Sequence, residues 1–413
     1  MSPLVVVVLI VLVDLLGFTI VMPLLGPFAK HYGFSPTQIG LLMAAFPMCQ
    51  LVAGPILGRL SDRYGRRPVL IVSQAGTAIS FVILGLSHDF TIMLLARMLD
   101  GASGGNILVA QAYVADVSPP EKRTRNLGMI GAAFGVGFVL GPLLGGLIVS
   151  LPVSPDWQLR LPFLVAAGFS TIAWLLVLTR LPESREGRSE ARVLSRRGLV
   201  DTARLPGVGR LVALGALNTL AFAALEGTFA LYLRERLGWS ERGAMFGFAY
   251  LGLVSAIVQG GLIRRLVPKF GEPRLIVAGL ALSVVGFAML GAVVSTPGVL
   301  GAIGLVGLGQ GLSGPSLIGL LSKSTPPSEQ GAVFGVSASA QTFARMVNHF
   351  AGNVLLGRVA ASAPFWEAAA IALLTLGLAS LTIGRVPVAA RETESDLDLA
   401  QAPAAAESTP RSA

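Results

Sequence analysis

Six ionisable side chains lie inside long apolar segments of the sequence: Asp14, Arg97, Asp100, Glu226, Arg345 and His349. A charged group at the centre of a membrane-spanning helix costs at least about 2.5–3.5 kcal/mol, so each of these is a functional candidate. A carboxyl group removed from water favours its neutral form and can take up a proton near neutral pH. The chemistry indicated is proton binding and release.

The spacing of these groups suggests which of them binds the proton and which is an electrostatic partner. Arg97 and Asp100 are three residues apart, so they share one face of a helix. Asp14 has no cation near it on its own segment, which favours it as the primary proton site. Asp100 and Glu226 are second candidates, or contacts for a cationic substrate, and Arg97 is their electrostatic partner. The alternative for each is a static ion pair, which fits Asp100 beside Arg97 best.

Enzymatic chemistry is not predicted. Three His residues, His31, His88 and His349, are scattered and Cys49 is the single cysteine, so no His and Cys metal cluster, metal site or cofactor is expected. The phosphate-binding pattern G-x-x-x-x-G-K-[ST] does not occur, which leaves direct drive by ATP unsupported. A membrane sensor would need a large soluble output domain, and no segment is long enough to form one.

Composition places these groups in a lipid environment. Of 413 residues, 53% are hydrophobic and 13% charged, whereas a soluble domain carries about 25% charged residues. Apolar segments of about 20 residues predict helices that span a membrane. They fall at 4–26, 36–58, 68–86, 90–114, 126–150, 161–180, 210–233, 243–263, 274–294, 298–321, 331–356 and 365–384. The expected fold class is an all-α integral membrane protein with twelve transmembrane helices.

The basic residues predict the orientation. When the loops between the predicted spans are numbered from the N-terminus, Arg and Lys are concentrated in the even-numbered ones, including Arg59 to Arg67 and Lys122 to Arg125. This excess marks those loops, and therefore both termini, as cytoplasmic. The net charge of +9 follows from these loops and does not indicate nucleic-acid binding. The polar stretch 181–209 is expected to link an N-terminal half (1–180) to a C-terminal half (210–385). The tail, 386–413, is expected to be disordered.

The two halves are predicted to be related. A shift of about 206 residues places GRLSDRYGRRPVLI (58–71) on RRLVPKFGEPRLI (264–276) and GFSPTQIGLL (33–42) near GWSERGAMFG (238–247). Parallel repeats of this kind are typical of transporters whose two six-helix halves are related by a pseudo-two-fold axis. Such transporters bind substrate near the bilayer midplane between the halves.

The loop after the second span, Gly54 to Ile71, resembles the signature loop of the major facilitator superfamily. In that family the loop latches one conformational state, with Asp62 as its anion, and Asp116 at the end of the fourth span is expected to pair with Arg63 or Lys122. The predicted conformational latch comprises Gly54, Gly58, Asp62, Arg63, Gly65, Arg66, Arg67 and Asp116.

The fifth span, GAAFGVGFVLGPLLGGL, resembles the motif that marks exporters in this superfamily. Its motif residues are Gly137, Gly141, Pro142, Gly145 and Gly146. The first span, with Asp14, Gly17, Pro23 and Gly26, is similar to the twelve-span drug:proton antiporters, in particular the tetracycline efflux proteins. Those exporters have a functional His in the eighth span where this chain has Ser255, four residues before Gln259, which argues against a metal–tetracycline substrate.

The resemblance implies a cavity lined by the first, fourth, seventh and tenth spans, with substrate and protons as partners. The expected function is export of small amphiphilic or drug-like compounds by proton antiport, and the alternative is proton-coupled uptake of a sugar or other metabolite. A monomer in the inner or plasma membrane is expected. Candidate substrate-binding residues are Phe18, Gln111, Phe222, Glu226, Gln259, Gln310, Arg345 and His349.

Overall fold

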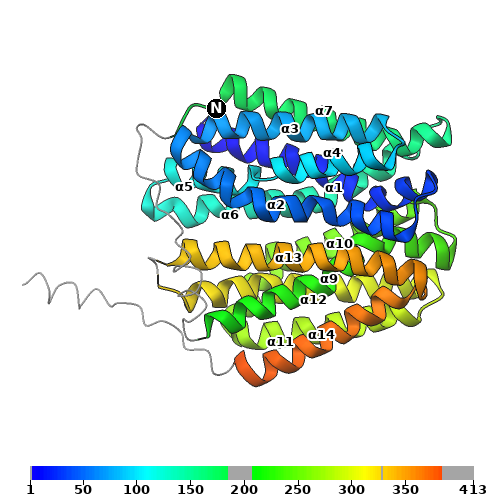
Figure 1. Ribbon diagram of the computed structural model, residues 1–413. Helices are drawn as coiled ribbons and strands as arrows, with labels where there is room; N and C mark the ends of the chain where they lie inside the picture. The colour runs from blue at the N-terminus through cyan, green and yellow to red at the C-terminus, as the bar shows by residue number, and fades with distance from the viewer. Residues whose placement is uncertain (1, 185–206, 327–328, 384–413) are drawn as a thin grey trace, which may run out of the picture.

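Each predicted span forms a helix in the computed structural model, which describes residues 2–184, 207–326 and 329–383 (Figure 1). Local signals set several of the helix starts. Ser35 and Gln38 form a reciprocal capping box at the start of α2, and Asp89 accepts a hydrogen bond from the backbone N–H of Ile92 at the start of α4. The predicted tail, 386–413, and most of the predicted linker, 181–209, lie outside the described residues.

The first half consists of seven helical segments that form six spans. They are α1 (Pro3–His31), α2 (Pro36–Tyr64), α3 (Arg66–Leu86), α4 (Phe90–Ser103), α5 (Asn106–Val117), α6 (Pro120–Ile148) and α7 (Pro155–Arg180). The predicted fourth span, 90–114, is therefore one membrane segment broken into two helices. Gly104 and Gly105 stand at the break, and the side-chain amide of Gln50 donates to the carbonyl of Gly104.

The second half repeats this arrangement below the first in the view of Figure 1. It consists of α9 (Val208–Leu237), α10 (Glu241–Ile257), the π-helical turn η1 (Val258–Leu262), α11 (Ile263–Ala292), α12 (Thr296–Lys323), α13 (Gln330–Arg358) and α14 (Ala363–Thr382). The bundle thus has the predicted all-α architecture of two six-helix halves.

Ten helical stretches within the described residues are long and apolar enough to cross a membrane. One of them, Glu241–Ala292, has 52 residues and would be about 78 Å long if straight, far more than a bilayer core of about 30 Å. Its chain turns at Gly271, whose φ is +74°, so it contains two spans. One further span, α13, is not among the ten stretches, and its centre holds polar side chains such as Gln341 and Asn348. The total is the predicted twelve.

Backbone conformation supports the internal repeat. Gly65 joins α2 to α3 with φ +102° and ψ 158°, and Gly271 turns the chain at the equivalent place with φ +74° and ψ 157°. Both values lie where only glycine is readily accommodated. The two residues are 206 positions apart, so the predicted shift holds in the structure as well as in the sequence.

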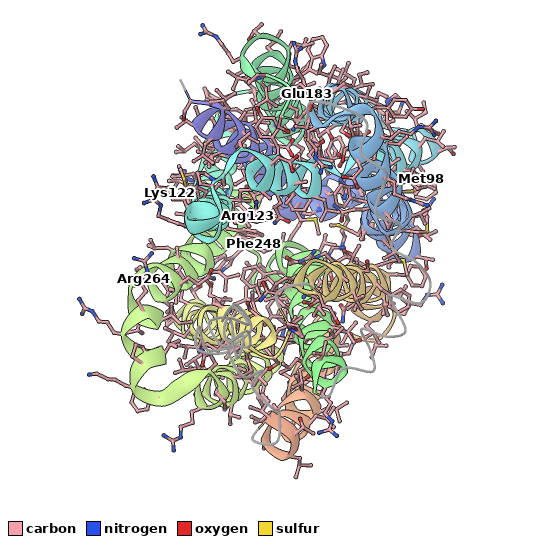
Figure 2. All side chains as sticks on the ribbon, turned by 90° about the vertical axis from the view of Figure 1, so that its left-hand side faces the viewer. Met98, Lys122, Arg123, Glu183, Phe248 and Arg264 are labelled. Carbon is pink, nitrogen blue, oxygen red and sulfur yellow. The ribbon has the colours of Figure 1, made fainter. Side chains whose placement is uncertain are left out.

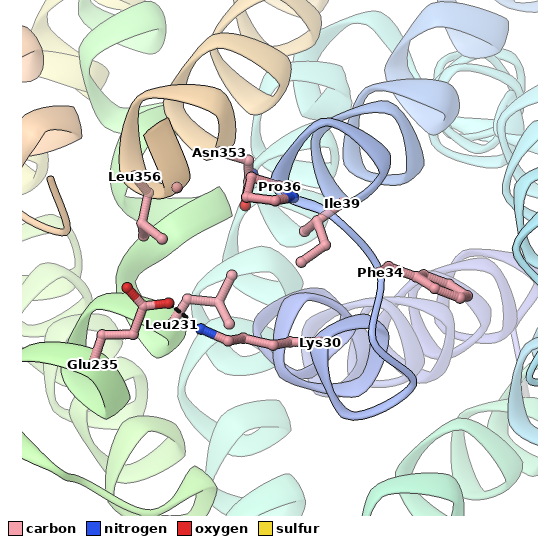
Figure 3. A pocket seen from close by; sticks show the side chains of 9 residues that line it. Lys30, Phe34, Pro36, Ile39, Leu231, Glu235, Asn353 and Leu356 are labelled. Atoms are coloured by element: carbon pink, nitrogen blue, oxygen red, sulfur yellow. Dashed lines mark hydrogen bonds and ion pairs between the residues drawn. The ribbon is translucent and has the colours of Figure 1, made fainter. Parts of the chain in front are cut away.

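The two halves meet at the distal end of the bundle, where α1 ends at His31, and not at the proximal end, where α1 begins at Pro3. There α2 packs on α13 and α6 packs on α10. Lys30 forms an ion pair with Glu235 across the halves, and Arg358 donates to the hydroxyl of Thr37. A pocket of about 380 Å³ lies in this seam beside the Lys30–Glu235 pair (Figure 3).

Toward the proximal end the same helices diverge. On α6, Phe138 and Gly146 contact α10, yet a Cβ built on Gly128, Gly131 or Gly135 would meet nothing within 4 Å. Figure 2 looks onto this end, where Lys122 and Arg123 of one half and Arg264 of the other flank the separation between the halves. Within the described residues, the contacts between the halves therefore lie toward the distal end.

A close backbone contact makes Gly252 a sensitive position of the seam. Pro142 has no N–H, so the carbonyl of Phe138 is free of its usual helical bond, and a Cβ on Gly252 of α10 would press against that carbonyl group. Overpacking of this kind costs about 1–3 kcal/mol. The variant Gly252→Ala is expected to open the distal end and to shift the conformational equilibrium about 5- to 150-fold.

The measurement is the labelling rate of a cysteine introduced in place of Phe34, which lines the distal pocket, by a membrane-impermeant maleimide. Cys49→Ser removes the single native thiol. Gly168→Ala is the matched control, because its added Cβ would meet nothing within 4 Å. Equal labelling rates in Gly252→Ala and in the control would show that this contact does not hold the seam.

Candidate functional site

A buried ion pair forms the centre of the first half. The Arg97 guanidinium donates from Nη1 to Asp100 Oδ2 at 2.8 Å, and the two side chains are 1% and 2% exposed. Arg97 also lies over the ring of Phe46, 4.9 Å from its centroid, and Phe46 in turn contacts Phe18. The predicted helical pairing of Arg97 with Asp100 is confirmed, and Phe18 belongs to the same group of side chains.

Asp14 lies next to this pair, at the break between α4 and α5. Because the chain restarts as a helix at Asn106, this side chain points across to α1, and its Nδ2 donates to Asp14 Oδ2 at 3.4 Å. Gln74 of α3 and Asp100 of α4 also lie near Asp14. The structure thus brings together Asp14, Arg97 and Asp100, three of the four residues predicted for proton coupling.

The fourth, Glu226, lies in the other half. Its Oε2 accepts from Nε of Arg345 at 2.9 Å and is 3.6 Å from Nε2 of His349. Glu226 and His349 are almost fully buried, whereas the Arg345 side chain is 35% exposed. His349 Nδ1 also lies 3.4 Å from the carbonyl oxygen of Met43 in the first half. This second cluster therefore contacts both halves at the inner limit of the closed seam.

The other predicted substrate contacts are more dispersed. Gln310 is held by Asn218 through two side-chain hydrogen bonds of 3.0 and 3.3 Å. Phe222 is partly buried at the edge of the core that spans the two halves, while Gln111 and Gln259 are exposed. Gln259 lies in the π-helical turn, a feature found frequently at functional sites.

Ser255 stands at the position where the resemblance calls for a histidine. Its hydroxyl donates to the carbonyl of Gly307 on α12 at 3.1 Å. The side chain is thus used to join two helices within one half.

The latch residues form a connected network at the proximal end. Arg66 contacts Asp62 at 2.8 Å and Asp116 at 3.0 Å, and also donates to the hydroxyl of Ser61. The partner of Asp116 is therefore Arg66, and not Arg63 or Lys122 as the sequence suggested. Arg63 instead lies over the ring of Tyr64. Arg66 can reach both carboxylates because Gly65 turns the chain at the start of α3.

Sequence reasoning missed the role of Glu183 in this network. Its carboxylate accepts the backbone N–H groups of Arg66 and Arg67 at 2.9 and 3.1 Å. An anion at a helix N-terminus is favourable, so Glu183 caps α3 from a distance. The guanidinium of Arg67 meanwhile donates to the carbonyl of Leu178 at the end of α7. Glu183 falls within the segment that the sequence predicts to be a linker, 181–209. The structure describes its first residues, including Pro182 and Glu183.

Two latch glycines differ in their surroundings. A Cβ on Gly54 would meet Leu108 of α5 at 3.4 Å, as expected of a small residue that admits a neighbouring helix. A Cβ on Gly58 would meet nothing within 4 Å among the described residues.

The glycine motif of α6 serves close packing on two neighbours. Gly137 and Gly141 face Leu15 and Thr19 of α1, and the hydroxyl of Thr19 donates to the carbonyl of Gly137 at 2.9 Å. Gly145 faces Met245 and Gly146 faces Phe246, both on α10 in the other half. The motif therefore lets α6 contact the first span and the opposite half at once.

Several polar residues that lie in or beside the two clusters were not singled out from the sequence. Asn106 contacts Asp14, Asn353 donates to the carbonyls of Gly227 and His349, and Glu367 accepts from the side chain of Asn348. Asn106 follows two glycines, and this break in an apolar segment was the signal that could have identified it.

Comparison with known proteins places this geometry in a family. The model of the Major Facilitator Superfamily matches residues 7–349 and 269–406. The class C tetracycline resistance protein of Escherichia coli is 30% identical over 86% of this chain and 89% of its own length. The mouse Major facilitator superfamily domain-containing protein 10 is 27% identical over 86% of this chain and 85% of its own length.

Solved structures agree on the architecture. The human organic anion transporter MFSD10 (TETRAN) superimposes with a TM-score of 0.70 at 27% identity, covering 91% of this chain and 98% of that one. A D-xylose–proton symporter superimposes with a TM-score of 0.75, but at 17% identity this likeness shows the fold alone.

Proposed function

The chain belongs to the major facilitator superfamily, and from this premise we propose that it exports small amphiphilic or drug-like compounds across a cell membrane in exchange for protons. Its class, a multi-pass membrane transporter of small molecules, follows from the family. The proposal adds the direction, the driving ion and the kind of substrate.

The observation that carries the proposal is the position of Asp14. This carboxylate lies at membrane depth on α1, beside a buried ion pair and next to a break in the fourth span. In the described residues it takes part in no salt bridge, so its charge is free to be neutralised by a proton. A proton taken up at Asp14 in one conformation and released in the other would couple the proton gradient to transport.

The substrate side of the proposal rests on the second cluster. Arg345 and Glu226 present a cation and an anion between the halves, and Phe18 and Phe222 are partly buried apolar side chains at the edge of the core that spans both halves. Amphiphilic compounds with one polar group fit such surroundings. The similarity to the tetracycline resistance proteins supports a drug-like substrate. The hydroxyl of Ser255 is bonded to the carbonyl of Gly307, so this residue gives no support to a metal–tetracycline complex as the substrate.

The transport cycle proposed is alternating access. The seam closes the distal end, and the latch network of Arg66, Asp62 and Asp116 lies at the proximal end, which we take to be the open one. We assign the proximal end to the cytoplasm, because the exposed cations Lys122, Arg123 and Arg264 are located there. On this assignment both termini are cytoplasmic, the membrane is the inner or plasma membrane, and one chain suffices for transport.

Purified protein in liposomes with an acidic interior provides the test. Ethidium, a permanent cation that is not trapped by pH, is expected to accumulate inside while the proton gradient collapses faster than in protein-free liposomes. Accumulation only in liposomes with an alkaline interior would instead support proton-coupled uptake. If no compound of a panel of drugs and sugars moves in either gradient, the proposal is wrong.

A further inference from the structure

Unsatisfied side-chain oxygen atoms lie at and beside Asp14. Asp14 Oδ1, Asn106 Oδ1 and both polar atoms of the Gln74 amide are buried and have no hydrogen-bond partner among the described residues. Gln74 is fully buried, and Asn106 is 6% exposed. Buried polar atoms in proteins are nearly always paired. Three unpaired oxygens from α1, α3 and α5 beside one another indicate a ligand that binds oxygen atoms.

The charge of the surroundings selects a cation. Asp14 and Asp100 are two carboxylates and Arg97 is one guanidinium, whose Nη1 is already bound to Asp100. The cluster therefore carries one negative charge in excess, and an uncompensated buried charge is highly unfavourable. A proton on Asp14 removes the charge, but its single O–H can satisfy only one of the two amide oxygens of Asn106 and Gln74. A metal cation of charge +1 removes the charge and binds those oxygens.

The break in the fourth span gives this site its shape. α4 ends at Ser103 and α5 begins at Asn106, so the chain is unwound at Gly104 and Gly105 beside Asp14. Transporters use discontinuous helices of this kind to expose backbone and side-chain oxygens to a coupling ion near the bilayer midplane. The Asn106 amide already lies 3.4 Å from the Asp14 carboxylate, and half a turn about its last bond directs its oxygen to the same place.

The second half supplies an internal comparison. α9 and α12 correspond to α1 and the fourth span, and they meet through Asn218 and Gln310. These two neutral amides donate to each other at 3.0 and 3.3 Å, so each satisfies the other. The corresponding helix pair of the second half is thus joined by amides that need no ligand, whereas the contact in the first half is incomplete without one.

We propose that Asp14, Gln74 and Asn106 bind a monovalent metal cation of the size of Na⁺ in the first half. Carboxylate and amide oxygens are ligands that hard cations prefer. No group of three or more His, Cys, Asp or Glu suited to a metal occurs in the described part of the chain, which disfavours a divalent ion. The inference builds on the proposed function, in that Na⁺ and the proton compete for the same carboxylate.

Thermal unfolding of the purified protein in lipid nanodiscs tests the site. At pH 8 and constant ionic strength, NaCl in place of choline chloride is expected to raise the Tm by about 2–4 °C. KCl should have a smaller effect. At pH 5.5 the Na⁺ effect is expected to shrink, because protonation of Asp14 removes the charged ligand.

Variants identify the residues involved. Gln74→Leu and Asn106→Ala should lose the Na⁺-dependent rise, and Asn106→Asp, which keeps an oxygen ligand, should retain it even if Asn106→Ala fails to fold. Asn218→Ala, in the corresponding helix pair of the second half, should keep the full rise. Equal Tm values in NaCl, KCl and choline chloride would overturn the inference, as would a Na⁺ effect that survives in both Gln74→Leu and Asn106→Ala.

The outcome is separable from that of the proposed function. If drug transport driven by protons is observed without any effect of Na⁺, the cation site is wrong and the function stands. If Na⁺ stabilises the protein through these residues but no compound is exchanged for protons, the site stands and the function is wrong.

Discussion

Asp14→Asn is expected to abolish proton-driven export while leaving compound binding in place. The amide has nearly the shape of the carboxyl group, and it still accepts the hydrogen bond from Asn106, but it cannot take up and release a proton. A charge at this depth in the membrane costs about 2.5–3.5 kcal/mol. If the protein can no longer remove that cost by protonating residue 14, the rate of proton-driven export should fall roughly 70- to 400-fold. The measurement is ethidium uptake into liposomes under an imposed proton gradient.

Asp89→Asn is the matched control for this substitution. Asp89 is exposed at the N-cap of α4, where asparagine caps a helix about as well, so proton-driven uptake should be unchanged. Compound binding to Asp14→Asn is followed by tryptophan fluorescence without a gradient, which separates loss of coupling from loss of the site. Full proton coupling in Asp14→Asn would exclude Asp14 as the carrier and direct attention to Asp100 and Glu226.

Arg97→Met is expected to destabilise the protein far more than the double variant Arg97→Met with Asp100→Leu. Removing one partner of a buried pair leaves an unpaired charge and costs about 3–5 kcal/mol, whereas replacing both by apolar residues is often neutral. Both side chains are almost completely buried, so water cannot compensate for the single change. Unfolding of the purified variants in detergent measures the difference.

Transport by the double variant then decides what the pair does. A stable double variant that no longer exchanges ethidium for protons would show that Arg97 and Asp100 take part in coupling. A stable double variant with normal exchange would show that the pair is a static element of the fold. If the double variant unfolds as readily as Arg97→Met, the pair does not act as a separate electrostatic unit.

The fold could be predicted from the sequence to a large extent. Apolar segments of membrane length predicted the number of spans, and the shift of 206 residues aligned the two loops in which Gly65 and Gly271 adopt a positive φ. Helical spacing was enough to pair Arg97 with Asp100, because both lie on one helix. These inferences depend on local periodicity alone, which a single sequence displays directly.

Contacts between distant segments could be predicted only in part. Asp116 pairs with Arg66 because the turn at Gly65 directs the Arg66 side chain toward α5. Glu183 caps α3 although it lies 117 residues later in the chain than Arg66. The pairing of Glu226 with Arg345 joins α9 to α13 across 119 residues. Such partners depend on how helices rotate and pack, and that information is not contained in the spacing of residues along either helix.

The distal seam has a consequence for how this protein can change over generations. Several of its close contacts are made to main-chain oxygens: Gly40 faces the carbonyl of Phe350, Gly252 faces that of Phe138, and His349 lies by that of Met43. Main-chain atoms are the same whatever side chain a residue carries. These contacts can therefore be kept when Phe350, Phe138 or Met43 is replaced, as long as the glycines remain. Substitutions of the side chains between the halves can then change which compounds bind, while the main-chain contacts that close the distal seam are kept.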